Sequence, residues 1–122
     1  MEKKTGLVSW RDLTVSNADE ISQFYSKVIG WEIEPLSMGE YKDYVMKTPT
    51  GEGVAGVCHA RGVNQGLPAQ WLIYITVENL DESLKKVTEL GGQVLGEKRS
   101  MGPSGFYCLV QDPAGACVML CG

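Results

Sequence analysis

The stretch WRDLTVSNADEISQFYSKVIGWEI, residues 10–33, decides the fold of this chain. It begins with a strand over residues 10–15, in which polar and apolar side chains alternate. Asn17 then opens a helix, with Glu20 three residues later to complete a capping box. Gly30 stops that helix, and a second strand follows at once. The stretch therefore predicts a strand, a helix and a strand.

The same pattern returns later in the chain. VSNADE at residues 15–20 matches VENLDE at residues 77–82, and Gly30 matches Gly92. Self-similarity at a fixed spacing indicates two copies of one structural unit. We therefore expect an α+β protein with two tandem βαβββ modules.

The remaining elements follow from alternation, turn residues and helical spacing. Module 1 takes up about residues 6–59, the connector 60–69 is rich in Gly, Asn and Pro, and module 2 takes up about 70–122 of a single domain, 1–122. Expected strands lie at about 31–37, 41–47, 54–59, 71–77, 93–99, 106–111 and 116–120, with a second helix near 80–90. Type I turns are expected at 48–51 and 112–115.

Composition excludes several classes of protein. The chain has 122 residues, 43% of them apolar and 21% charged, which is typical of a soluble globular domain. Its net charge of −4 and its lack of a Lys/Arg cluster argue against nucleic-acid binding. Neither a membrane span nor a signal peptide is recognisable, so we expect a cytoplasmic protein with four reduced cysteines.

One helix cannot cover both faces of a four-stranded sheet. The second face of each module must meet the other module, another chain or a ligand. We expect curved mixed sheets around a cup, with the helices on the outer face. Function is then expected in the cup.

At this point the residues resemble a known family. The doubled βαβββ unit, Phe24-Tyr25 before Gly30-Trp31, and Asp112-Pro-x-Gly115 are similar to the vicinal oxygen chelate superfamily. That family includes glyoxalase I, extradiol dioxygenases and bleomycin-resistance proteins. The segments WRDL at 10–13 and WLIY at 71–74 resemble a glyoxalase-like subgroup of unassigned function. The resemblance implies a homodimer.

The resemblance also implies where a metal site would lie. Metal-using members place ligands on the first and last strands of each unit, which here correspond to Trp10, Leu72, Met119 and either Ala55 or Val57. Divalent ions such as Zn²⁺ need imidazole, carboxylate or thiolate ligands. We therefore expect no metal site and no cofactor.

Two polar residues are candidates for chemistry. Strand alternation places Asp12 inward, and the repeat places Tyr74 at the equivalent position. Asp12 is expected to serve as a ligand anchor or base, or else to pair structurally with the Tyr74 hydroxyl. His59, the only histidine, shares strand parity with Ala55 and Val57, so it is either a base pointing into the cup or an ordinary hydrogen-bonded side chain.

An apolar set completes the candidate site. It is expected either to contact a ligand or to be plain core, and it consists of Trp10, Leu72, Cys117 and Met119. Residues 101–105 form a glycine-rich loop that is either a flap over the cup or a simple connection.

The sequence leaves three functions open, and it favours binding over catalysis. The first is metal-independent binding of a small hydrophobic or aromatic molecule in the cup. The second is a glyoxalase-like lyase or isomerase that uses a non-standard metal site or Asp12/His59 acid–base chemistry. The third is a structural or interaction module without a ligand.

Overall fold

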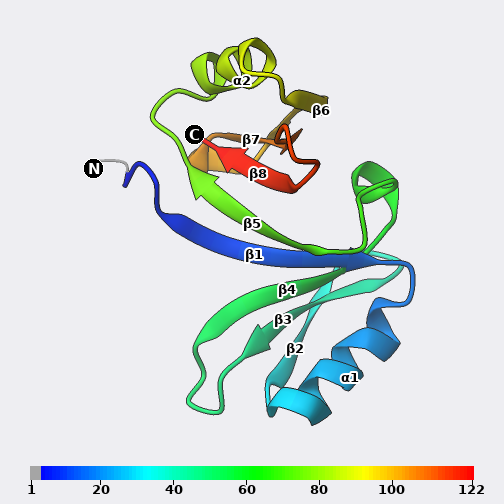
Figure 1. Cartoon of the computed structure of the whole chain (residues 1–122). Helices are drawn as coiled ribbons and strands as arrows, with labels where there is room; N and C mark the ends of the chain where they lie inside the picture. Colours follow the sequence, from blue (N-terminus) through cyan, green and yellow to red (C-terminus); the bar gives the residue numbers. More distant parts are fainter. Residues whose placement is uncertain (1–3) are drawn as a thin grey trace. The chain divides into compact units, whose positions relative to one another are not determined.

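The structure is a computed structural model that describes residues 4–122. The order βαβββ occurs twice along these residues, which confirms the predicted α+β class and the tandem repeat (Figure 1). The first copy contains β1 (Val8–Val15), α1 (Ala18–Ile29), β2 (Glu32–Ser37), β3 (Lys42–Lys47) and β4 (Gly53–His59). The second contains β5 (Trp71–Thr76), α2 (Leu80–Glu89), β6 (Gln93–Ser100), β7 (Phe106–Gln111) and β8 (Cys117–Cys121). Short 3₁₀ turns occur at Gly62–Asn64 and Gly102–Ser104.

The described chain divides into two compact units. The α1 unit is Arg11–Trp71, and the α2 unit is Leu72–Gly122 together with the residues up to Trp10. In the α1 unit, β1 pairs in parallel with β4, whereas β4 with β3 and β3 with β2 are antiparallel. In the α2 unit, β5 pairs in parallel with β8, whereas β8 with β7 and β7 with β6 are antiparallel. Each unit is thus a mixed sheet with one helix.

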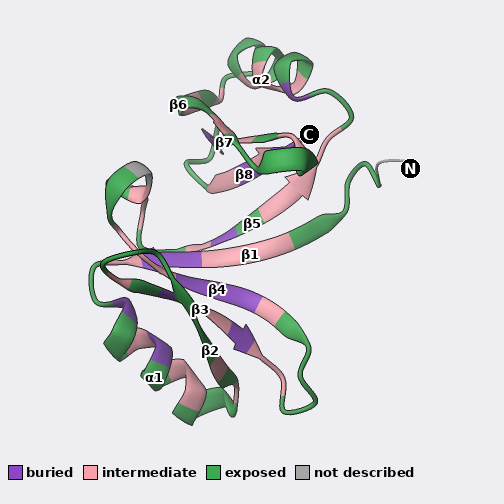
Figure 2. Ribbon diagram, turned by 180° about the vertical axis from the view of Figure 1, so that it is seen from behind, coloured by how far each residue is buried: buried purple, intermediate pink, exposed green. Residues whose placement is uncertain are grey.

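The core of the α1 unit forms where α1 lies against β3 and β4. Ala18 from the helix meets Met46, Ala55 and Val57 from the strands, and all four are fully buried (Figure 2). Met46 and Ala55 are partners across β3 and β4, so both side chains point to the same face. A long side chain opposite a small one fills the space under the helix without a gap.

The helix ends follow the predicted glycine stop, with one correction. Gly30 has a φ of 93° and donates its N–H to the Ser26 carbonyl, which is the left-handed C-cap that glycine permits. Asn79 caps α2, because its side chain accepts a hydrogen bond from the N–H of Glu82 at 3.0 Å. The predicted capping box at Asn17 is wrong: the Asn17 amide donates to the Glu20 carboxylate, at 3.4 Å, and leaves the helix N–H groups uncapped by that side chain.

A polar contact ties the first turn of α1 to β3. The Tyr44 hydroxyl donates a hydrogen bond to the Asp19 carboxylate. This bond, followed by burial and by the charges of Asp19 and Asp43, raises the pKa of Tyr44 from 10.0 to about 12. The protonated phenol is therefore part of what fixes α1 on its sheet.

The second helix covers its sheet less completely. α2 packs on β6 and β7, and Leu80 is its only buried residue. The chain leaves α2 through Gly92, where an added Cβ would lie 2.7 Å from the Gln111 carbonyl oxygen. Because α2 packs on β6 and β7, the side of β8 that faces α2 is only half-buried. Neither α1 nor α2, the α-helices of the described chain, has the length and apolar character needed to span a bilayer.

Both predicted turns form. Gly51 donates its N–H to the Thr48 carbonyl at 2.8 Å, and Gly115 donates to the Asp112 carbonyl at 3.0 Å. These bonds join the first and fourth residues of each turn, as in a hydrogen-bonded β-turn. All four cysteines carry free thiols, as expected.

Replacing Met46 by alanine tests the core of the α1 unit. The fully buried side chain leaves a cavity, so Met46→Ala should lower the free energy of unfolding by about 2–5 kcal/mol. Met38→Ala is the matched control: Met38 is 44% exposed, and its loss should change the unfolding free energy by less than about 0.5 kcal/mol. Urea denaturation measures both, and equal losses would refute the assignment of the core.

The contact between Tyr44 and Asp19 predicts a dependence on pH. The raised pKa means that the fold favours the protonated phenol, so its contribution is complete below pH 10 and is lost as the pH rises toward 12. Asp19→Asn should move the Tyr44 titration down toward 10.0. The measurement is tyrosinate absorbance, with the Tyr44→Phe protein subtracted to isolate this phenol. An unchanged titration in Asp19→Asn would contradict the contact.

Candidate functional site

Four of the predicted ligand residues lie on one face of the sheet in the α2 unit. Tyr74 is the register partner of Met119, and both point to the same face as Leu72 and Cys117, two residues away on the same strands. The alternating residues Val118 and Leu120 point to the other face, where they line a pocket with residues of α2. The structure thus brings the predicted set together on the face opposite α2.

That face is apolar, aromatic and rich in sulfur. Leu72 and Met119 are 1% and 3% exposed, whereas Tyr74 and Cys117 are half-buried. The Tyr74 ring lies 5.9 Å, between centroids, from the ring of Tyr107 on β7. Trp10 belongs to the same unit through the first residues of β1 and is half-buried. Whether these residues contact a ligand stays a prediction.

A pocket of about 280 Å³ lies at one end of this unit, beside residues 101–105. Thr76 and Cys121 are register partners on the face opposite α2, and both line the pocket. The Cys121 Sγ lies 3.9 Å from the Ser9 Oγ and 4.0 Å from the Thr76 Oγ1. The full lining is Ser9, Thr76, Met101, Ser104, Cys121 and Gly122.

The loop beside this pocket is held by its own backbone. Met101 donates its N–H to the Gly105 carbonyl at 2.8 Å, and Gly122 donates to the Phe106 carbonyl at 2.9 Å. Gly105 has a φ of 109°, and a Cβ there would lie 2.9 Å from the Gly122 carbonyl oxygen. Only glycine fits this close approach. The loop therefore has a fixed base and an exposed tip, formed by Met101 and the 3₁₀ turn.

The positions at which the family holds a metal do not fit one here. The indole of Trp10, the isobutyl group of Leu72 and the thioether of Met119 are not ligands for hard divalent ions. Across residues 4–122, no group of three or more His, Cys, Asp and Glu side chains is arranged to hold a metal ion.

One assignment of strand face needs correction. Ala55 and Val57 were expected to correspond to an inward ligand position, but both are buried in the core against α1. β4 instead presents Gly56 and Cys58 to the opposite face, in register with Asp12 and Thr14. The sequence GVAGVC has small or apolar residues at every position, so it contained no alternation that would distinguish the two faces.

Asp12 lies on this opposite face of the α1 unit. Burial raises the pKa of the nearby Cys58 thiol, and the charges of Asp12 and Asp43 raise it further. Cys58 is therefore a protonated thiol and not a ready nucleophile. Asp12 is half-buried, and its role as a ligand anchor, a base or a partner of Tyr74 stays a prediction.

His59 meets two carboxylates that the sequence did not identify. Its Nδ1 lies 2.8 Å from the Lys42 carbonyl oxygen and 3.5 Å from Asp43, and its Nε2 lies 3.7 Å from Asp19. The His59 backbone N–H donates to the Asp43 carboxylate at 2.8 Å. Asp43 is 5% exposed, so these protein partners replace the water that would otherwise hydrogen-bond its carboxylate. His59 thus joins the contact between α1 and β3, on the side of the sheet where Ala55 and Val57 pack, and not the predicted cup.

Comparisons with known proteins agree with this architecture. The model of the Glyoxalase/Bleomycin resistance protein/Dioxygenase superfamily matches residues 7–120. The protein named "Putative glyoxylase CFP32" from Mycobacterium bovis is 32% identical over 121 residues, which cover 98% of this chain and 46% of that protein. The anthracycline biosynthesis protein DnrV of Streptomyces peucetius is 27% identical over 123 residues, covering 91% and 45%. This chain therefore spans about half the length of these curated relatives.

Solved structures share the fold at low sequence identity. A crystal structure of a superfamily member from Vibrio splendidus 12B01 superposes with a TM-score of 0.59 at 14% identity, covering 92% of this chain and 95% of the other. At that identity the likeness concerns the fold alone. Together with the family model, which matches nearly the whole length, it assigns this chain: it belongs to the Glyoxalase/Bleomycin resistance protein/Dioxygenase superfamily.

Proposed function

We propose that this chain binds a small hydrophobic or aromatic molecule, without a metal ion, on the face of the α2 unit that lies opposite α2. The ligand occupies the pocket beside residues 101–105, at one end of the sheet face that carries Tyr74 and Met119. The observation that carries this proposal is the pocket itself. It is lined by the buried Cys121 thiol, by hydroxyl groups and by the Met101 side chain, and it lies next to an aromatic and sulfur-rich sheet face.

The size and chemistry of the pocket indicate the class of ligand. Small-molecule sites usually occupy roughly 300–1,000 Å³, so a pocket of about 280 Å³ suits a small ligand of two or three rings. The hydroxyls of Ser9 and Thr76 offer a few directed hydrogen bonds in an otherwise apolar lining. Thioether and thiol sulfur atoms pack favourably against aromatic rings. A neutral aromatic molecule satisfies all three features.

Two further points support the proposal, the first for binding without a metal and the second for an aromatic ligand. The residues at the family's ligand positions are Trp10, Leu72 and Met119, whose side chains give apolar contact and no coordination. DnrV is named for the biosynthesis of anthracyclines, which are polycyclic aromatic compounds. A relative with that name is consistent with an aromatic ligand for this chain. Cytoplasmic location and a homodimer, expected from the sequence, stay predictions.

The neutral fluorescent probe N-phenyl-1-naphthylamine tests the proposal. Met101→Asp places a charge at the pocket, and it should weaken binding of the probe about tenfold, since the apolar contact of a methionine is lost. Met38→Asp is the control: Met38 is similarly exposed, at 44% against 37%, but lies in the α1 unit. Probe fluorescence measures both affinities.

The same titration, repeated in EDTA, tests independence from metal. The account expects an unchanged affinity of the wild-type chain for the probe. Equal affinity of the Met101→Asp and wild-type proteins for the probe would refute binding in the pocket beside residues 101–105. Loss of binding in EDTA would refute metal independence.

A further inference from the structure

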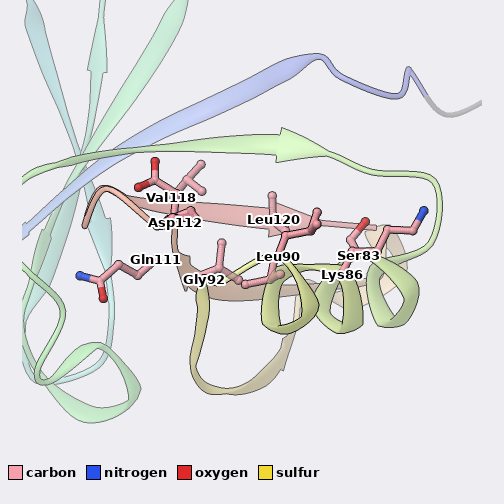
Figure 3. A pocket seen from close by; sticks show the side chains of 11 residues that line it. Ser83, Lys86, Leu90, Gly92, Gln111, Asp112, Val118 and Leu120 are labelled. Atoms are coloured by element: carbon pink, nitrogen blue, oxygen red, sulfur yellow. The ribbon is translucent and has the colours of Figure 1, made fainter.

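We propose a second binding site in the α2 unit, on the other face of the sheet, for an unbranched aliphatic carboxylate of medium length. The site is the α2 groove, a pocket of about 340 Å³ between α2 and strands β7 and β8 (Figure 3). This inference does not rest on the proposed function, because the two pockets share no residue.

The walls of the α2 groove are apolar on both sides. Val87 and Leu90 line it from the helix, and Val110, Val118 and Leu120 line it from the strands. Val110 and Val118 are register partners, so they present one continuous apolar surface. Leu90 is 75% exposed, which shows that α2 does not close over this surface. An aliphatic chain laid in the groove would remove the exposed parts of Leu90, Val118 and Leu120 from water.

The helix sets the length of the α2 groove. Its lining residues Ser83, Lys86, Val87 and Leu90 follow the spacing i, i+3, i+4 and i+7, which places them along one stripe of α2. Seven residues at ~1.5 Å each give a stripe of about 10 Å. Since three chain bonds span roughly 3.5 Å, an extended chain of about eight to nine bonds matches that length.

The two ends of the α2 groove differ in charge and in free hydrogen-bonding capacity. Figure 3 shows Lys86 and Ser83 at one end and Gln111 and Asp112 at the other. The Asp112 Oδ1 already accepts the N–H groups of Ala114 and Ala116, at 2.8 and 3.1 Å. The Gln111 amide likewise donates to the Gly115 carbonyl at 3.2 Å. At the Asp112 end, the side chains of Gln111 and Asp112 are thus already hydrogen-bonded within the 112–115 turn and to the residue after it.

The Lys86 end is the one that can receive a charged head group. Among residues 4–122, Lys86 is the only cationic side chain that lines the α2 groove, and its ammonium makes no ion pair within 4.0 Å. Glu82, one helical turn before Lys86, does not line the α2 groove; it lines an adjoining polar pocket together with Ser83 and Lys86. Ser83 precedes Lys86 by three residues on α2, which places the two residues about one helical turn apart on one stripe. A carboxylate seated between these two groups would gain a charge pair and a hydrogen bond.

Octanoate and 1-octanol are the probes for this site. In ¹H–¹⁵N spectra of the whole chain, both should shift the amides of α2 and β8. Lys86→Glu should weaken octanoate about fivefold, near the upper limit for an exposed charge pair, and leave 1-octanol unchanged. Lys85→Glu is the matched control, since Lys85 neighbours Lys86 but does not line the α2 groove. Leu90→Gln should weaken both probes, whereas Leu36→Gln, at a 50% exposed leucine of the α1 unit, should weaken neither.

Three outcomes would overturn the proposal. In the first, the shifted amides lie beside residues 101–105, so that the probes occupy the other pocket. In the second, Lys86→Glu and Lys85→Glu bind octanoate equally, so that the head group lies elsewhere. In the third, octanoate does not bind and Leu90→Gln lowers the mass in analytical ultracentrifugation, so that a second copy of the chain covers the groove.

Discussion

Each unit of this protein has two sheet faces and one helix, and the rest of the structure depends on that constraint. Side chains alternate between the faces of a strand, so every residue either packs toward the helix or lies on the face that the helix cannot reach. In the α1 unit, Met46, Ala55 and Val57 take the helix side and are fully buried. In the α2 unit, the helix leaves Val118 and Leu120 only half-buried.

The two units place different residues on the faces opposite their helices. The α1 unit places Asp12, Thr14 and Cys58 there, with the buried Asp43 at the edge. The α2 unit places Leu72, Tyr74 and Met119 on its equivalent face. Buried carboxylates need fixed partners, whereas an apolar and aromatic surface gains free energy from any shape that fits it. This difference is why the α2 unit is the better candidate for binding a hydrophobic molecule.

The sequence predicted the elements well and the pockets poorly. The helices and strands were predicted to within about two residues, because Gly30, Gly91 and two Pro/Gly turns mark their ends. Tyr74 and Met119 were predicted to share a face, and they do. These features depend on local backbone preferences and on a period of two.

The errors have physical causes that the sequence patterns did not resolve. The Asn17 amide turns to the Glu20 carboxylate, although the sequence offered a capping box. The His59 ring contacts Asp19 and Asp43, which lie 40 and 16 residues away in the sequence. The α2 groove depends on how far the helix stands from β8, and helix packing distance follows from the side chains of the whole unit. Contacts between distant residues decide the last two of these.

Native mass spectrometry of untagged, freshly purified protein tests the central claim most directly, since one spectrum reports bound metal and any organic ligand. The account predicts chains that carry no divalent ion and that retain an added aromatic probe as an intact mass. Wild-type protein that carries a divalent ion in fixed ratio to the chain, and that loses the probe when EDTA removes the ion, would contradict metal-independent binding.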